Sequence, residues 1–249
     1  FVNRIRRRNG IFTMSACGDD AFFWHYGPLE NGDKLFKDAF FYDFSARQVY
    51  YRSYEALNFN WFIEEKVDAI IPTALDYSGC YRKSKKIRDI ILLPVDCSSY
   101  EKVALASDRL RVFHGINRIG IRGSKYVERA FTILKEIYGD SVEFIMEGNM
   151  SLRKYEDSLR KSHIIVDQVN SKGFGMNAVI SLALGKIVVG SDNSPFTQNS
   201  AILNAKAEVD ELVYVLGNLL SEGDLSALSN KSREYALNHL DSSIVAKQY

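Results

Sequence analysis

Residues 163–190 read HIIVDQVNSKGFGMNAVISLALGKIVVG, and this stretch is the clearest indication of the fold class. The apolar run at 163–166 predicts a buried strand, and residues 175–184 predict a helix closed by Gly185. A second apolar run at 187–190 predicts another strand. A strand, a helix and a strand of these lengths indicate a parallel β-α-β unit.

The same alternation continues on both sides of this stretch. Residues 110–249 are therefore expected to form a doubly wound, Rossmann-like lobe with a parallel sheet. Further strands are predicted at 111–114 and 142–146, and helices at 124–137, 151–162, 209–220 and 224–239.

The first part of the chain, residues 1–96, carries only three strand signals. These lie at 11–14, 68–72 and 90–93, and helical periodicity within 36–65 predicts one or two helices. A lobe of this type usually has more strands. We therefore expect a partial Rossmann-like lobe, cut at its N-terminus, and a linker at 97–109.

The composition narrows the functional class. With 32 Lys and Arg against 31 Asp and Glu, the 249 residues carry a formal charge of +1, which argues against nucleic-acid binding. Apolar runs fall far short of the roughly 20 residues that cross a bilayer. The three cysteines lack the spacing of metal ligands, so reduced thiols, a cytoplasmic location and no metal site are expected.

Two loops that follow predicted strands carry the main candidate residues, because ligands of doubly wound sheets bind beyond the carboxyl ends of strands. The loop 114–125 combines glycines with Arg118, Arg122 and Lys125, donors that suit a diphosphate, although a solvated turn has the same composition. His114, at its start, is interpreted as a structural residue. The second loop, 167–177, favours a ligand site over a plain turn because its glycines allow close approach of a ligand.

A third candidate is the turn SACGDD at 15–20 in the first lobe. Asp19 and Asp20 would supply a general base or bind a hydroxyl-rich substrate. The alternative is that one of them caps the following helix.

The loop 114–125, the strand VEFIM and residues 167–190 resemble, in order and spacing, the C-terminal lobe of group-1 glycosyltransferases with the GT-B fold. The resemblance covers most of residues 110–240, and its most specific part is GFG followed ten residues later by Gly185-Lys186. The first lobe is similar more loosely, through SACGDD. The expected fold class is therefore α/β, GT-B-like, with two Rossmann-like lobes and an incomplete first lobe.

The resemblance implies a role for each matching residue. Arg118 and Arg122, or Lys125, would hold the donor diphosphate. The backbone of Gly173, Phe174, Gly175, Met176 and Asn177 would supply amides near the sugar and the phosphates.

The match breaks where the family carries two glutamates, since this chain has Lys172 and Ile180 at those positions. Two interpretations stay open. Asp167, Asn170 and Asn177 hold the donor hydroxyls instead, as in a divergent capsular-type subgroup, or the donor site has decayed.

The function implied is transfer of a sugar from a nucleotide diphosphate sugar to a surface polysaccharide or a lipid-linked glycan precursor. Such a reaction needs no cofactor beyond the nucleotide-sugar donor. Peripheral contact with the inner face of a membrane would involve the basic residues within 4–8 or within 82–88. The alternatives are a sugar-nucleotide epimerase on the same fold and a non-catalytic lobe that binds sugar nucleotides.

Overall fold

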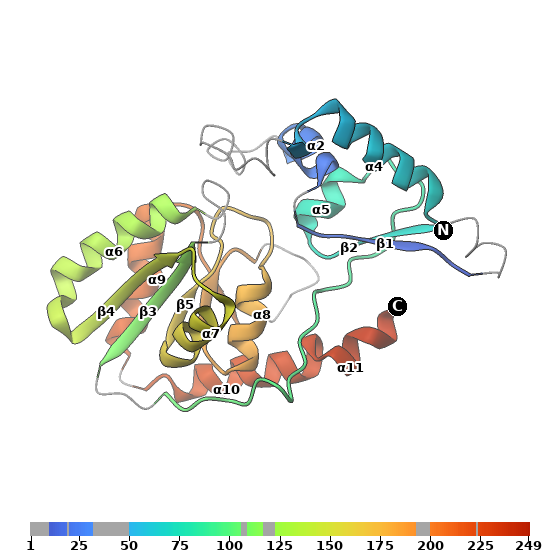
Figure 1. The fold of residues 1–249 in the computed structure, drawn as a ribbon. Coiled ribbons are helices and arrows are strands. Elements are labelled where there is room, and N and C mark those ends of the chain that lie inside the picture. The colour runs from blue at the N-terminus through green and yellow to red at the C-terminus, as the bar shows by residue number, and fades with distance from the viewer. Residues whose placement is uncertain are drawn as a thin grey trace. The chain divides into compact units, whose positions relative to one another are not determined.

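A computed structural model describes residues 10–18, 20–31 (backbone only for 28–31), 50–105, 109–116, 123–192, 200–222 and 224–249. The chain divides into two compact units, Phe1–Leu92 and Leu93–Tyr249. Figure 1 shows both units, coloured along the chain.

The second unit is built on a parallel sheet. Among its described residues the sheet has five strands in the order β4-β3-β5-β6-β7, so the chain crosses over β3 on its way from β4 to β5. This confirms the predicted doubly wound lobe. The strands are β3 (Leu110–Ile116), β4 (Val142–Gly148), β5 (Ile164–Val166), β6 (Ile187–Gly190) and β7 (Ile202–Asn204).

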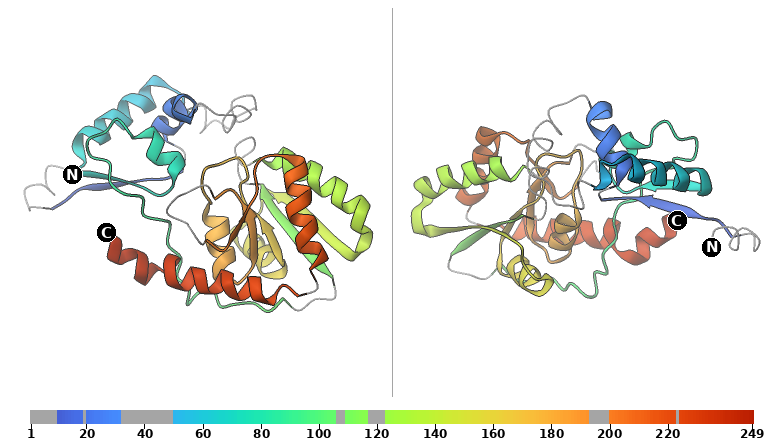
Figure 2. Two further views of the ribbon diagram at one scale, coloured as in Figure 1. Left: turned by 180° about the vertical axis from the view of Figure 1, so that it is seen from behind. Right: turned by 45° about the horizontal axis from the view of Figure 1, so that its top comes forward.

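Helices cover both faces of this sheet (Figures 1 and 2). On one face, α6 and α9 pack over Val112, Ile164 and Val189. On the other, α7 and the end of α8 contact Phe113 and Ile165. The α/β helices are α6 (Ser124–Tyr138), α7 (Leu152–Lys161), α8 (Met176–Ala183) and α9 (Val209–Ser221), with the 3-10 turn η3 (Gly139–Ser141) after α6.

The C-terminal helices hold the segment that enters the second unit. Val95 donates its N–H to Leu240 O at 2.8 Å and accepts from Ser242 N at 2.9 Å. The predicted linker at 97–109 thus falls inside the second unit. The predicted helix at 224–239 is split by a π-helical turn, and the elements are α10 (Ser226–Tyr235), η5 (Ala236–Leu240), α11 (Ser242–Val245) and η6 (Ala246–Gln248).

The first unit has a smaller parallel sheet, with two strands among its described residues. β1 pairs with β2 from Thr13↔Ala69 to Ala16↔Pro72. The predicted strand at 90–93 is not a strand, although Ile91 N donates to Pro72 O at 3.0 Å. The elements are β1 (Thr13–Ala16), α2 (Ala21–Asn31), α4 (Tyr54–Lys66), β2 (Ala69–Pro72) and α5 (Leu75–Cys80).

The described residues contain no membrane-spanning helix, no metal-binding cluster and no disulfide. No helix there is long and apolar enough to span a bilayer. No group of three or more His, Cys, Asp or Glu residues there is placed to hold a metal ion. Cys17, Cys80 and Cys97, all within the described ranges, form no disulfide.

Candidate functional site

The carboxyl ends of β3 and β5 are joined through His114, which is buried near the end of β3. In the neutral ring, Nδ1 donates to Val166 O at 2.8 Å and Nε2 accepts from the Ser124 hydroxyl at 2.8 Å, because a carbonyl oxygen can only accept. His114 therefore ties the last residue of β5 to the first residue of α6. This agrees with its interpretation as a structural residue.

The start of α6 also packs directly against the loop that follows β5. Gly123, the N-cap of α6, has φ +80°, and a Cβ there would lie 2.6 Å from Val169 Cγ2 and 3.2 Å from Asn170 Cβ. Glycine is required on both grounds, the left-handed backbone and the close approach. The loop predicted to bind phosphate thus ends against the loop predicted to bind the donor.

Of the three cationic residues expected to bind the diphosphate, only one lies within the described residues. Arg118 and Arg122 lie outside the described residues. Lys125 is the second residue of α6, and its Nζ lies 4.8 Å from the centroid of the Tyr126 ring.

The loop between β5 and α8 is held by its own side chains. The buried Asp167 carboxylate accepts the Gly175 N–H at 2.8 Å, which fixes the start of α8. Gln168 Nε2 donates to Ser171 Oγ at 2.9 Å and to Gly173 O at 2.6 Å. The loop is therefore ordered before any ligand arrives.

Asn170 is the exception within this ordered loop. Its side chain is 6% exposed, and Nδ2 has no hydrogen-bond partner among the described residues. An unpaired buried donor costs about 1–3 kcal/mol. Asn170 lies beside Gly123 at the start of α6, so the loop predicted to bind the donor carries an unsatisfied donor group at this contact.

Two helix N-termini meet at this edge of the sheet. The first N–H groups of a helix have no partner within the helix and carry partial positive charge. Neither α6 nor α8 has an acidic side chain in its first turn to offset that charge. At the start of α8, Phe174 and Asn177 are buried, while Met176 is 37% exposed.

Ser191 is a residue of this edge that the sequence did not reveal. It directly follows β6, donates its N–H to Gln168 O at 2.9 Å and donates its hydroxyl to Val169 O at 2.8 Å. A Cβ on Gly190 would lie 3.2 Å from Gln168 O. In the sequence, Gly190 at the end of a predicted strand was the feature that could have indicated this close approach.

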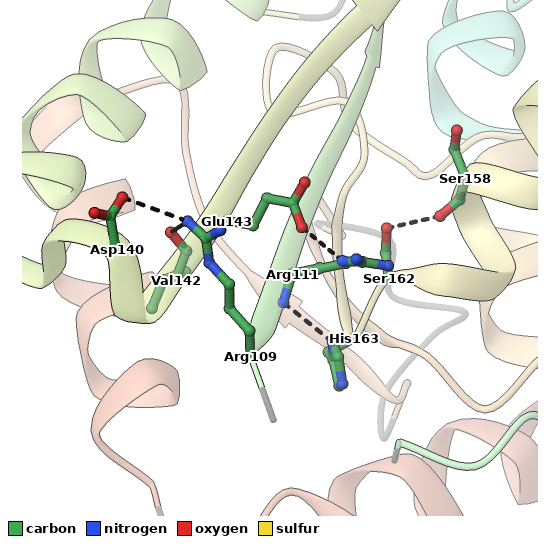
Figure 3. Close-up of polar contacts among 8 residues, drawn as sticks. All are labelled: Arg109, Arg111, Asp140, Val142, Glu143, Ser158, Ser162 and His163. Atoms are coloured by element: carbon green, nitrogen blue, oxygen red, sulfur yellow. Dashed lines mark hydrogen bonds and ion pairs between the residues drawn. The ribbon is translucent and has the colours of Figure 1, made fainter. Parts of the chain in front are cut away.

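The opposite edge of the sheet, at the amino ends of the strands, also carries charged groups (Figure 3). Arg111 pairs through Nε with Glu143 Oε2 at 2.6 Å and donates its backbone N–H to His163 Nδ1 at 3.1 Å. Arg109 lies 3.8 Å from Asp140. These side chains pair with one another, so they brace β3, β4 and β5 instead of presenting free groups to a ligand.

Lys186 is a buried cation at the same edge. Its Nζ donates to Arg160 O at 2.7 Å. Burial, together with the nearby charge of Arg160, lowers the pKa of Lys186 to about 8. Burial, Lys186 and Arg111 also lower the pKa of His163.

In the first unit, Asp20 has the contacts of a helix cap. Its Oδ1 accepts the Phe23 N–H at 2.7 Å, and its Oδ2 accepts the Tyr81 hydroxyl at 2.9 Å. Burial and the charge of Asp20 raise the pKa of Tyr81, so this hydroxyl stays protonated. These contacts match the capping alternative. Asp19 lies outside the described residues, and a general base in this turn stays a prediction.

Of the two basic runs considered for membrane contact, only the second lies within the described residues. Residues 4–8 lie outside the described ranges. In the second run, Arg82, Lys83, Lys85 and Arg88 are exposed, whereas Lys86 Nζ donates to Glu64 O and Glu65 O at 2.8 Å each.

No protein-family model and no curated protein matches this sequence. Solved structures do match. Sucrose-phosphate synthase from Thermosynechococcus elongatus aligns with 99% of this chain and 73% of its own, at 15% identity and a TM-score of 0.62. The chain has a GT-B-like fold. The predicted α/β, GT-B-like fold class is therefore confirmed, and the incomplete first lobe stays a prediction.

Two further structures share parts of this GT-B-like fold. A GtfA/B complex aligns with 78% of this chain at 13% identity and a TM-score of 0.53. The N-terminal domain of Candida albicans trehalose-6-phosphate phosphatase aligns with 74% at 9% identity and a TM-score of 0.58. This chain spans 46% and 57% of their lengths, respectively. Identities this low establish the fold alone, and the names of these proteins do not describe a single reaction.

Proposed function

We propose that the chain is a glycosyltransferase that takes a sugar from a nucleotide diphosphate sugar and passes it to a glycan or lipid-linked acceptor. The GT-B-like fold, shared with sucrose-phosphate synthase, supports sugar transfer in general. The nature of the acceptor, a surface polysaccharide or its precursor, is proposed from the resemblance of residues 110–240 alone.

One observation carries the proposal: the contact of Gly123 with Val169 and Asn170. Through this contact, the segment that contains Arg118 and Arg122 ends against the loop that leads into α8. Arg122 directly precedes Gly123 in the chain. In this proposal, the guanidinium groups of Arg118 and Arg122 and the two helix N-termini would serve one diphosphate.

The donor diphosphate would accept hydrogen bonds from the first turns of α6 and α8. When the bond to the sugar breaks, negative charge builds up on the leaving phosphate and positive charge on the anomeric carbon. Fixed donors therefore stabilise the transition state more than the bound substrate.

The sugar side of the site relies on amides in place of the glutamates that the family carries. Asp167 already accepts the Gly175 N–H, so we assign it the role of orienting α8. Asn170 and Asn177 remain to contact the donor hydroxyls. An amide both donates and accepts, and a hydroxyl requires the same of its partner.

The test is a thermal-shift screen with UDP-, GDP- and ADP-sugars, followed by product analysis. One of these donors should raise the midpoint of unfolding of the wild-type chain, and Asn170→Ala should reduce that rise. Asn218→Ala, an exposed amide on α9, is the matched control and should behave as wild type. Product analysis then separates transfer from epimerisation and from binding without turnover. A chain that responds to none of the donors contradicts the proposal.

A further inference from the structure

The first unit contains a cavity of about 260 Å³ between α2, α4 and the residues that follow α5. Among the described residues, four aromatic side chains line it: Phe22, Tyr26, Trp61 and Tyr81. None of the described lining residues belongs to β1 or β2 or to the turns directly after these strands.

The aromatic wall is held in place by contacts outside the cavity. The ring of Phe22 lies 5.2 Å from that of Tyr26 in an edge-to-face pair and 4.8 Å from that of Tyr81. The Tyr81 hydroxyl donates to Asp20 and accepts from Asn60 Nδ2, at 2.9 Å each. Because both ends of this hydroxyl are engaged, the Tyr81 ring is fixed before a ligand binds.

Polar groups of both signs lie among these rings. Glu64 and Lys83 line the cavity, and neither side chain has an ion pair or hydrogen bond within the described part of the chain. The backbone of Glu64 is held, because Lys86 Nζ donates to Glu64 O at 2.8 Å. Ser84 adds a hydroxyl to the lining. The cavity thus offers one charged acceptor and one charged donor on a fixed frame.

Trp61 contributes the largest ring of the cavity and is 45% exposed. Its exposed ring is available to pack against an apolar face of a ligand. An aliphatic chain would cover the rings but would leave Glu64 and Lys83 beside apolar atoms without partners, which is unfavourable. The ligand must therefore have an apolar face and a rim of hydroxyl groups.

We propose that this cavity binds a single hexose ring of a glycan. A pyranose has an apolar face of C–H groups, which stacks on aromatic rings, and hydroxyls, which donate to the Glu64 carboxylate and accept from the Lys83 ammonium. The cavity lies below the ~300 Å³ at which pockets for larger ligands begin, so a nucleotide sugar is too large. The inference rests on the proposed function, since it gives the glycan acceptor a second point of attachment.

The experiment titrates the whole chain with methyl glycosides of glucose, galactose and N-acetylglucosamine while tryptophan emission is recorded. The chain has two tryptophans, of which Trp24 is buried and Trp61 lines the cavity. At least one glycoside should change the emission in a saturable way, and Trp61→Leu should abolish glycoside contact in a readout that does not use tryptophan emission. Saturation-transfer NMR on the same samples should show contact with the protein.

The polar groups are tested with matched pairs of variants. Glu64→Gln should weaken glycoside affinity by up to about tenfold, because it keeps an acceptor oxygen but removes the charge that strengthens the hydrogen bond. Glu65→Gln changes the neighbouring carboxylate, which does not line the cavity, and should leave the affinity unchanged. Lys83→Met and Lys85→Met form the second pair, with loss expected only at Lys83.

The outcomes separate this inference from the proposed function. If nucleotide sugars stabilise the chain but no glycoside binds, or if Glu64→Gln and Glu65→Gln weaken binding equally, the cavity does not bind a hexose and the proposed function stands. If glycosides bind and the variants respond as expected while no nucleotide sugar binds, the cavity binds a hexose, but sugar transfer is overturned and with it the role of the cavity in holding a glycan acceptor. If neither ligand binds, both are overturned.

Discussion

Gly123 and Val169, from two different loops, approach so closely that one added carbon on Gly123 would lie 2.6 Å from Val169 Cγ2. This contact joins the start of α6 to the loop that leads into α8, and the proposed donor site depends on it. Replacing either loop by an unrelated turn would separate the groups that are proposed to bind one diphosphate.

Gly123→Ala should destabilise the chain by about 1–3 kcal/mol, because the new methyl overlaps Val169 and the backbone has a positive φ. It should also weaken nucleotide-sugar binding. Gly139→Ala is the control, since Gly139 has φ +53° but no heavy atom within 4 Å of the added carbon. Urea unfolding measures both variants. An equal loss at the two positions would show that backbone strain, and not the contact with Val169, is responsible.

Gly217→Ala should stabilise the chain by about 0.5–1 kcal/mol, because Gly217 lies inside α9 and alanine restricts the unfolded chain more than glycine does. The added carbon would meet its nearest atoms, in Tyr138 and Leu134, at 3.9 and 4.0 Å, which are ordinary contacts. Thermal unfolding gives the change. A lower midpoint than that of wild type would contradict this description of the α6–α9 packing.

Asp167→Ala should cost about 1.5–3 kcal/mol of stability, because it removes a buried charged acceptor and leaves the Gly175 N–H without its partner. Binding of a nucleotide sugar should also weaken, since the start of α8 is no longer fixed. Asp157→Ala removes an exposed carboxylate from α7 and should be neutral. If both variants bind the donor as wild type does, Asp167 has no role in orienting α8.

Arg118→Ala should lower turnover about 10²–10³-fold with the fold intact, the usual cost of losing one transition-state donor. Turnover is measured as release of the nucleoside diphosphate. Arg129→Ala removes an exposed arginine from α6 and serves as the control. Unchanged turnover in Arg118→Ala would remove this residue from the diphosphate site.

Lys186 predicts a pH dependence of stability. Its pKa is lowered from 10.5 to about 8, so between these values the unfolded chain holds a proton that the folded chain has released. The contribution of Lys186 to the free energy of unfolding therefore rises with pH across this window. The stability of the wild type relative to Lys186→Met should increase from pH 8 to pH 10.5. Parallel pH profiles of the two proteins would contradict this assignment.

Much of the second unit could be predicted because its signals are local. The apolar residues Val127, Ala130, Phe131 and Leu134 recur at helical spacing, and all four are buried on α6. The strand β7 was missed because its three residues, Ile202–Asn204, form too short a run to show a pattern. The π-helical turn η5 was missed because a single change of backbone hydrogen bonding leaves no periodic trace.

The candidate site was predictable only in part. Glycines and basic residues after strands indicated which loops to examine. The cap that Asp20 forms with the Phe23 N–H is local and was one of the two readings of its turn, but the bond from the Tyr81 hydroxyl to Asp20 and the missing partner of Asn170 Nδ2 depend on residues distant in sequence. No local pattern encodes such contacts.

The Arg233 guanidinium donates to three carbonyl groups, those of Cys97 and Tyr100 in the segment that enters the second unit and that of Ala183 at the end of α8. Arg233 therefore binds both the entering chain and α8, the helix whose first turn faces the proposed diphosphate. A displacement of α8 along its axis would pull on the entering chain through this shared anchor. Binding of a ligand at the first turn of α8 would then be mechanically linked to the entering chain at the other end of this helix.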